Sequence, residues 1–259
     1  MDVRALSFTG STRTGRAIQE ASAKSNLKNL IFELGGKSPA IVFEDANLSK
    51  AVPETAHSIQ WNSGQVCMAN SRVYVQRSIA PAFIEAFKEN FGNVALGDPT
   101  EPKTTHGPLA DSIQAEVVGG YVARGKESGK LALGGEFEPR SFTIRPTIFT
   151  DTEEDAKIMK EEVFGPVVNI NIFDTEEEAL EKANASEYGL YAAVYTQDVG
   201  RALRFAVGLE SGTVGVNCTS PQTSFDMPFG GYKASGVGRE GIRDSLDNFL
   251  EKKTVLLRM

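Results

Sequence analysis

The C-terminal part of the chain alternates between short apolar segments and segments in which apolar residues recur at helical spacing. This pattern predicts strands at 167–173, 190–196 and 212–217, separated by helices at 175–185 and 198–208. Such alternation is typical of parallel βαβ units with right-handed crossovers. We therefore expect an α/β protein in which helices flank a parallel sheet.

The N-terminal part continues the pattern with shorter strands. Strands are predicted at 5–9, 28–34, 39–43 and 72–76, with two more at 131–133 and 144–149 around a polar turn. Apolar residues also recur at helical spacing from Leu48 to Ile59. Because proline lacks an N–H and clashes with the preceding turn, this helix is expected to start later or to kink at Pro53.

The composition narrows the possible functions. With 259 residues, 41% of them hydrophobic and 24% charged, the chain can bury a sizeable core. The net charge of −7 and the lack of a basic stripe argue against a nucleic-acid partner. No apolar run approaches the roughly 20 residues of a membrane span, and the first residues do not resemble a secretory signal. We therefore expect a cytoplasmic protein without a membrane partner.

Cysteine and histidine are scarce. The chain has two of each, Cys67 and Cys218 and His57 and His106, without the spacing of a metal site. Two thiols without the spacing of a metal site fit a reducing compartment, and no metal is expected. Cys218 is read as a residue at the end of a strand.

Cys67 and Glu33 are the candidates for chemistry. Small and polar residues surround Cys67, whereas an inert core thiol more often has an apolar run on both sides. A thiolate attacks an electrophilic carbon and leaves well from the resulting thioester. Glu33 follows the apolar run 30–32, and a carboxylate in a partly apolar pocket can activate water. Taken singly, each residue has an ordinary alternative, a buried inert thiol and a solvated carboxylate at a strand end.

The residues around this pair resemble a known family. Glu33 begins Glu-Leu-Gly-Gly-Lys-Ser-Pro, and Cys67 lies within Gly-Gln-x-Cys-x-Ala-x-x-Arg. These two motifs, in this order, closely resemble those of the aldehyde dehydrogenase superfamily. The resemblance implies that an aldehyde is oxidised to a carboxylic acid through a thiohemiacetal on Cys67, with hydride transfer to NAD or NADP. Glu33 would assist hydrolysis of the thioester.

The resemblance also implies a cofactor site. The turn 8–11 leads into a helix, which alone is only a weak indication of an anion site. In the family the corresponding turn contacts the pyrophosphate, and Glu-Glu-x-Phe-Gly-Pro, found here at 161–166, contacts the nicotinamide ribose and ring. The cofactor-binding residues expected from the resemblance are Gly10, Ser11, Leu34, Gly35, Glu162 and Phe164.

Three residues are expected in the substrate pocket. Trp61 and Met68 flank the cysteine loop, and Phe229 belongs to a late glycine-rich loop that resembles the family's loop near the substrate entrance. For Trp61 and Met68, ordinary core packing is the alternative.

The resemblance runs from residue 2 to the C-terminus, although family members are about twice as long. We expect residues 1–35 to be a remnant of a Rossmann-like dinucleotide-binding domain. Residues 36–235 would form the catalytic domain and 236–259 a C-terminal return and oligomerisation segment. The N-terminal half, with most of the cofactor domain, is expected to be absent. Exposed sheet edges and an apolar C-terminal strand at 253–257 predict a homo-oligomer.

Two alternatives to an autonomous dehydrogenase stay open at this stage. The chain could be a cysteine-dependent esterase that needs no cofactor. It could also be a non-catalytic interaction protein that retains the fold.

Overall fold

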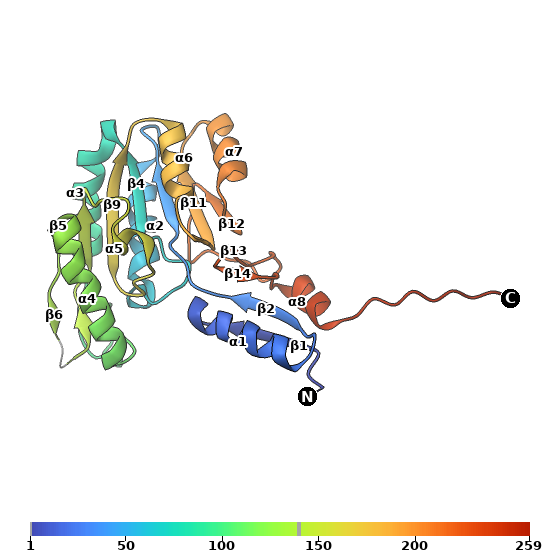
Figure 1. The fold of residues 1–259 in the computed structure, drawn as a ribbon. Coiled ribbons are helices and arrows are strands. Elements are labelled where there is room, and N and C mark those ends of the chain that lie inside the picture. The colour runs from blue at the N-terminus through green and yellow to red at the C-terminus, as the bar shows by residue number, and fades with distance from the viewer. Residues whose placement is uncertain (1, 139–140) are drawn as a thin grey trace.

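The computed structural model describes residues 2–138 and 141–259, and its centre is a seven-stranded sheet (Figure 1). Neighbouring strands are parallel throughout except for β5, which runs antiparallel to β8 at one edge. The predicted α/β fold with a parallel sheet is thus confirmed. In spatial order the strands are β12 (Thr213–Val216), β11 (Tyr191–Tyr195), β3 (Pro39–Val42), β4 (Arg72–Gln76), β9 (Val167–Phe173), β8 (Thr147–Thr150) and β5 (Lys130–Leu133).

Helices cover both faces of this sheet, because successive side chains on a buried strand point to opposite sides. Val73 and Val75 on β4 pack with α2 (Leu48–Gln60) and α3 (Ala80–Gly92), whereas Tyr74 packs with α6 (Glu176–Asn184) and α7 (Val199–Gly208). The helix α3 carries a stripe of three phenylalanines at four-residue intervals, Phe83, Phe87 and Phe91, and all three are buried. A third cluster joins α4 (Ser112–Ser128) and α5 (Lys157–Lys160) to the β8 side of the sheet.

A smaller sheet lies beside the large one (Figure 1). In it β2 (Asn29–Glu33) pairs in parallel with β1 (Ala5–Thr9) and antiparallel with β14 (Gly236–Val237). The helix α1 (Thr12–Ser25) connects β1 to β2, and α8 (Ile242–Phe249) follows β14. The segment 34–38 leads from β2 directly into β3, so the Glu33 motif links the two sheets.

The remaining elements are short. Two antiparallel pairs are β6 (Phe137–Glu138) with β7 (Thr143–Ile144), and β10 (Tyr188–Gly189) with β13 (Tyr232–Lys233). Two 3-10 segments cover Trp61–Gly64 and Arg77–Ile79.

The structure corrects two expectations about local structure. The helix containing Pro53 does not start late but begins at Leu48, because Asn47 caps it by accepting a hydrogen bond from the Ser49 N–H at 3.1 Å. The strand expected over 144–149 is split into β7 and β8 around Pro146, which has no N–H to donate.

The C-terminal residues extend away from the body after α8 (Figure 1). Residues 250–259 are exposed and contain no strand, so the strand expected at 253–257 does not form within this chain. Val255, Leu256 and Leu257 are between 75% and 93% exposed. An apolar segment of this kind has no partner in the described part of the molecule.

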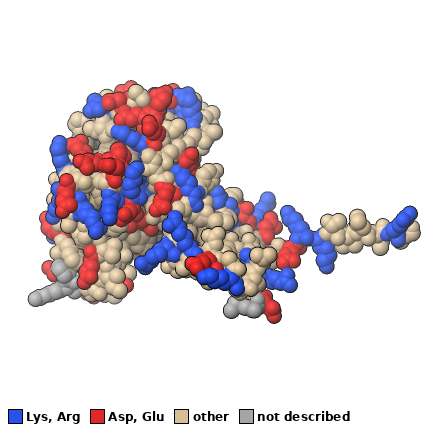
Figure 2. Space-filling view, viewed as in Figure 1, with Lys and Arg blue, Asp and Glu red and all other residues tan. Residues whose placement is uncertain are grey.

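Acidic and basic side chains are interspersed over the face shown in Figure 2. Among the described residues, no helix is both long and apolar enough to span a membrane. Within the same ranges, no group of three His, Cys, Asp or Glu side chains could hold a metal ion.

Candidate active site

Residues 65–71, which we call the cysteine turn, carry Cys67. Two glycines, Gly64 and Gly36, make the close contacts that hold this turn against the other two sequence motifs. Cys67 follows α2 and the segment Trp61–Gly64, and it precedes β4. A Cβ on Gly64, where φ is +74°, would overlap the carbonyl of Gly165. A Cβ on Gly36 would likewise overlap the carbonyl oxygen of Cys67. The three sequence motifs therefore pack against one another, and glycine is required at these contacts.

Most of the predicted site residues surround one cavity of about 800 Å³. Its lining combines the turn before α1, the link between β2 and β3, the cysteine turn, one side of α4 and the segment 162–164. The predicted residues that line it are Gly10, Ser11, Leu34, Gly35, Trp61, Cys67, Met68, Glu162 and Phe164. Glu33 and Phe229 are not among the lining residues.

Glu33 is the last residue of β2 and directly precedes the cavity-lining residues Leu34 and Gly35. Its side chain is 4% exposed, and neither carboxylate oxygen has a hydrogen-bond partner among the described residues. Burial raises the pKa of Glu33 to about 8, the charge of Glu240 adds to the rise, and Arg239 opposes it. A carboxyl with this pKa can hold or release a proton near neutral pH.

Cys67 is half-buried, and its thiol is hard to ionise. Burial raises the pKa of Cys67 to about 11, and the charges of Glu162 and then Glu33 contribute to the rise. The backbone N–H groups of Cys67 and Met68 oppose the shift. Cys67 lines the cavity, and Glu33 directly precedes Leu34 and Gly35, which line it as well.

Glu162 is held against the Glu33 motif. Its carboxylate accepts a hydrogen bond from the Gly36 N–H at 2.8 Å. Burial raises the pKa of Glu162 to about 7, while the Gly36 bond and Lys37 lower it. Lys37 is 2% exposed, and its Nζ has no hydrogen-bond partner among the described residues. Burial and then the charge of Arg72 lower the pKa of Lys37 to about 7, against the pull of Glu162.

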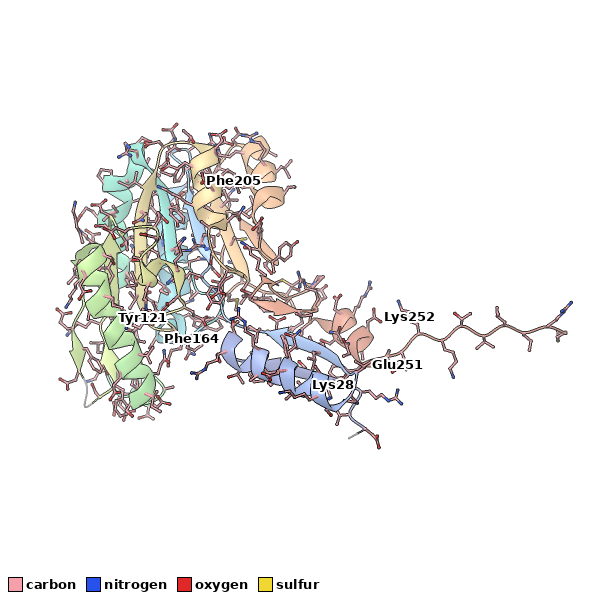
Figure 3. The ribbon with its side chains drawn as sticks, viewed as in Figure 1. Lys28, Tyr121, Phe164, Phe205, Glu251 and Lys252 are labelled. Atoms are coloured by element: carbon pink, nitrogen blue, oxygen red, sulfur yellow. The ribbon has the colours of Figure 1, made fainter. Side chains whose placement is uncertain are left out.

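Phe164 presents its ring to the cavity. It has a positive φ of 56° and is 38% exposed, which is unusual for a large apolar side chain. The Gln114 amide on α4 donates to the Phe164 carbonyl at 2.9 Å and to the Val163 carbonyl at 3.1 Å. In the view of Figure 3, Phe164 lies between α4 and α1. An open ring held in this way can pack on a flat heterocycle.

The turn before α1 lines the cavity through Thr9, Gly10 and Ser11. Ser11 caps α1, and its hydroxyl accepts a hydrogen bond from the Thr14 N–H at 3.2 Å. The Gly10 N–H donates to the Glu33 carbonyl at 3.0 Å, which ties this turn to the end of β2. A helix N-terminus in this position favours an anion.

The substrate-pocket residues are divided. Trp61, which is 44% exposed, and Met68 both line the cavity. Phe229 instead forms a two-way backbone pair with Glu240, with both N–H to carbonyl bonds at 2.7 Å. The late glycine-rich loop that contains Phe229 thus affects the site through the charges of Arg239 and Glu240, which act on the pKa of Glu33.

Some site residues were missed by the sequence analysis. Lys37 lies inside a quoted motif, but lysine is almost always exposed, so nothing indicated its burial. Asn62, Gln65 and Gln114 line the cavity as uncharged polar residues without any distinctive spacing.

The sequence model of the aldehyde dehydrogenase family matches residues 1–255. The chain belongs to the aldehyde dehydrogenase family. Two of its relatives, each 46% identical, are an aldehyde dehydrogenase of Davidiella tassiana and aldehyde dehydrogenase (NAD(P)+) 2 of Saccharomyces cerevisiae. The matches cover 100% and 98% of this aldehyde dehydrogenase-family chain, but 52% of each relative. The chain therefore spans about half the length of these relatives, and it matches their C-terminal half.

Solved aldehyde dehydrogenases have the same fold. An indole-3-acetaldehyde dehydrogenase of P. syringae, solved with NAD+, has a TM-score of 0.96 and 38% identity, over 100% of this chain and 53% of its own. An aldehyde dehydrogenase of Mycobacterium tuberculosis complexed with NAD+ has a TM-score of 0.94 and 37% identity, over 100% of this chain and 54% of its own. At these identities the likeness covers the family as well as the fold.

Proposed function

We propose that this chain carries the catalytic site of an NAD- or NADP-dependent aldehyde dehydrogenase, with Cys67 as nucleophile and Glu33 as the base that activates water. The observation that carries the proposal is the single cavity. Cys67, Glu162, Phe164 and the turn before α1 all line it, Glu33 directly precedes the lining residue Leu34, and the charge of Glu33 contributes to the raised pKa of Cys67.

In the first step the Cys67 sulfur adds to the aldehyde carbon. A C–S bond forms, the carbonyl π electrons move to oxygen, and the thiol proton must leave. In this proposal the backbone N–H of Cys67 donates to the resulting oxyanion, an interaction that can be worth about 3 kcal/mol. The raised pKa of Cys67 means that the thiol keeps its proton at neutral pH, so we assign the loss of this proton to solvent and reserve Glu33 for the second step.

The second step releases the acid. Glu33 takes a proton from water, the water oxygen attacks the thioester carbon, and the C–S bond breaks with thiolate as the leaving group. The Glu33 carboxylate oxygens are buried without hydrogen-bond partners among the described residues, so the ionised form, which is favoured as the pH rises through about 8, can accept that proton.

The cavity suits a dinucleotide cofactor, which when bound would supply the hydride acceptor between these two steps. Glu162 offers a carboxylate for ribose hydroxyls, and Phe164 offers an open ring face. Ser11 and Gly10 would hold a phosphate at the start of α1, and Leu34 and Gly35 line the wall between these groups.

Calorimetric titration of the chain with NAD+ and NADP+, followed by an assay of aldehyde-dependent NADH or NADPH formation, tests this proposal. Reduced cofactor should form, Cys67→Ala should abolish it, and Glu33→Gln should slow mainly the release of acid. Binding of neither nucleotide, or unchanged turnover in Cys67→Ala, would contradict the proposal.

A cofactor-independent esterase is the second candidate, because the Cys67 and Glu33 pair alone suffices for acyl transfer to water. Ester hydrolysis that depends on Cys67, in a chain that binds neither nucleotide, would favour this alternative.

We also propose that the chain forms a homo-oligomer. Three apolar residues spaced four apart on α7 are exposed, namely Val199 at 71%, Leu203 at 62% and Val207 at 88%. Together with the apolar tail they offer a surface that a second copy could cover. The division into domains at 1–35, 36–235 and 236–259 and the cytoplasmic location stay predictions.

A further inference from the structure

Behind the cysteine turn lies a group of buried polar side chains that the proposed chemistry does not use. Ser58 comes from α2, Asn70 from the turn itself, and Thr219 and Ser220 from the segment after β12. All four are between 0% and 3% exposed. Three parts of the chain that are distant in sequence thus place polar groups at one buried point.

Their hydrogen bonds form a closed ring with the turn. The Asn70 N–H donates to the Ser58 hydroxyl at 3.0 Å, the Ser58 and Ser220 oxygens lie 2.5 Å apart, and the Ser220 hydroxyl donates to the Met68 carbonyl at 2.7 Å. A hydroxyl has only one proton to donate. Since Ser220 gives its proton to Met68, Ser58 must be the donor between the two serines.

The ring therefore runs in one direction, from the Asn70 amide through Ser58 and Ser220 to the Met68 carbonyl. It joins the two ends of the three-residue segment that follows Cys67. A one-way chain of hydrogen bonds in a dry interior strengthens each member. Thr219 adds a clamp from outside the ring, because its hydroxyl donates to the Asn70 side-chain oxygen at 2.5 Å.

The position of Met68 matters for the sulfur. The backbone N–H groups of Cys67 and Met68 are the groups that favour the Cys67 thiolate, against burial and two carboxylates. A turn that is free to rotate at Met68 would lose this alignment. Buried hydroxyls that bonded only within their own helix would have no such effect.

We propose that Ser58 and Ser220 are positioning residues for the nucleophile, which fix the turn after Cys67 so that the Met68 N–H faces the sulfur. This inference rests on the proposed role of Cys67. Its test needs neither aldehyde nor cofactor, because the reactivity of Cys67 can be measured directly.

The measurement is the rate of Cys67 alkylation by iodoacetamide between about pH 7 and about pH 10, with the Cys67 peptide quantified by mass spectrometry. Ser58→Ala and Ser220→Ala should each slow alkylation by about 3- to 10-fold at every pH in this range, so that the curve of rate against pH is displaced to higher pH. The double variant should lose no more than the worse single variant, because one break opens the ring.

Thr55→Val is the matched control. Thr55 lies one turn earlier on α2, is fully buried, and donates at 2.6 Å to Ala51 within its own helix. This variant should lower thermal stability about as much as Ser58→Ala but leave the alkylation profile unchanged. If Thr55→Val slows alkylation equally, or if the two serine effects multiply, the positioning role is wrong.

Thr219 keeps the test decisive if a serine variant does not fold. Thr219→Val removes the hydroxyl at constant shape and should slow alkylation, whereas Thr219→Ser keeps the hydroxyl and should not. Equal rates for the two would overturn the proposal. Unchanged aldehyde turnover in Cys67→Ala would instead overturn the proposed function, and the alkylation result would still stand for the ring.

Discussion

Gly36 lies directly against the carbonyl oxygen of Cys67, so any side chain at residue 36 would displace the nucleophile's own peptide group. This contact joins the motif that carries Glu33 to the one that carries Cys67. It explains why two glycines follow Glu33 and Leu34: the first makes room for the Glu162 carboxylate and the second for the cysteine turn.

Gly36→Ala should therefore lower both stability and Cys67 reactivity. The added methyl group would overlap backbone rather than a movable side chain, so a cost of about 2–4 kcal/mol is expected in urea unfolding. Gly120→Ala is the control, because a Cβ there meets open space on α4 and should be neutral or stabilising by up to about 1 kcal/mol. Equal effects of the two substitutions would show that the close contact is not made.

Glu162→Gln should make Cys67 easier to ionise. The carboxylate contributes to the raised pKa of Cys67, so removing its charge lowers that pKa and increases the thiolate fraction at any pH below about 11. Alkylation at about pH 9 should be about 3- to 10-fold faster. Glutamine can still accept the Gly36 hydrogen bond, so the fold should be retained.

Glu161→Gln is the control for that experiment. Its carboxylate accepts a hydrogen bond from the Tyr121 hydroxyl at 2.6 Å and does not contribute to the shift at Cys67. Alkylation should be unchanged in this variant. A slower reaction in Glu162→Gln would contradict the claim that the Glu162 carboxylate raises the pKa of Cys67.

Glu33→Gln should make stability less dependent on pH. The pKa of Glu33 is about 8 in the folded chain and near 4.5 when unfolded, so between these values the unfolded chain releases a proton that the folded chain keeps. The contribution of Glu33 to the stability of the folded chain is therefore fully present below about pH 4.5 and is lost as the pH rises to about 8.

The free energy of unfolding of Glu33→Gln, relative to that of wild type, should increase by about 1–3 kcal/mol as the pH rises from about 5 to about 8. Urea unfolding of both chains measures this, and their difference isolates Glu33 from other titrating groups such as Lys37. Glu20→Gln, on the exposed side of α1, should show no such gain. A difference that stays constant across this range would mean that the Glu33 pKa is not raised.

The proposed oligomer makes its own prediction. Replacement of Leu203 by Asp in the exposed α7 stripe, or deletion of 250–259, should lower the molar mass measured by light scattering to that of one chain. Lys24→Asp, on an exposed part of α1, should leave the mass unchanged. A wild-type chain that is already monomeric would contradict the proposal.

Much of the fold could be predicted because its causes are local. Buried strands such as 167–173 and the phenylalanine stripe of α3 show their periodicity in the sequence. Of the two alternatives expected for α2, a late start or a kink at Pro53, the structure excludes the late start, because Asn47 caps the helix before Leu48. The expected C-terminal strand requires a pairing partner, and the described chain offers none at 253–257.

The candidate site could be predicted only for residues that lie within a recognisable sequence motif and also have a chemically reactive or ligand-binding side chain. Cys67, Glu162 and Phe164 line one cavity, as the resemblance implied, but their roles stay proposals. The burial of Lys37 depends on tertiary packing, and lysine gives no local sign of it. The ring of Ser58 and Ser220 was equally invisible, because serine is common in loops and helices alike.

The most direct test of the shared Cys67 and Glu33 site is pre-steady-state hydrolysis of p-nitrophenyl acetate, with mass spectrometry of the acylated chain. Wild type should give a burst equal to its Cys67 content and then turn over, at a rate that rises with pH through about 8. Glu33→Gln should keep the burst, lose about 100-fold or more of the turnover, and retain the acyl group on Cys67. Undiminished turnover in Glu33→Gln, or an acyl group on any other residue, would contradict the account.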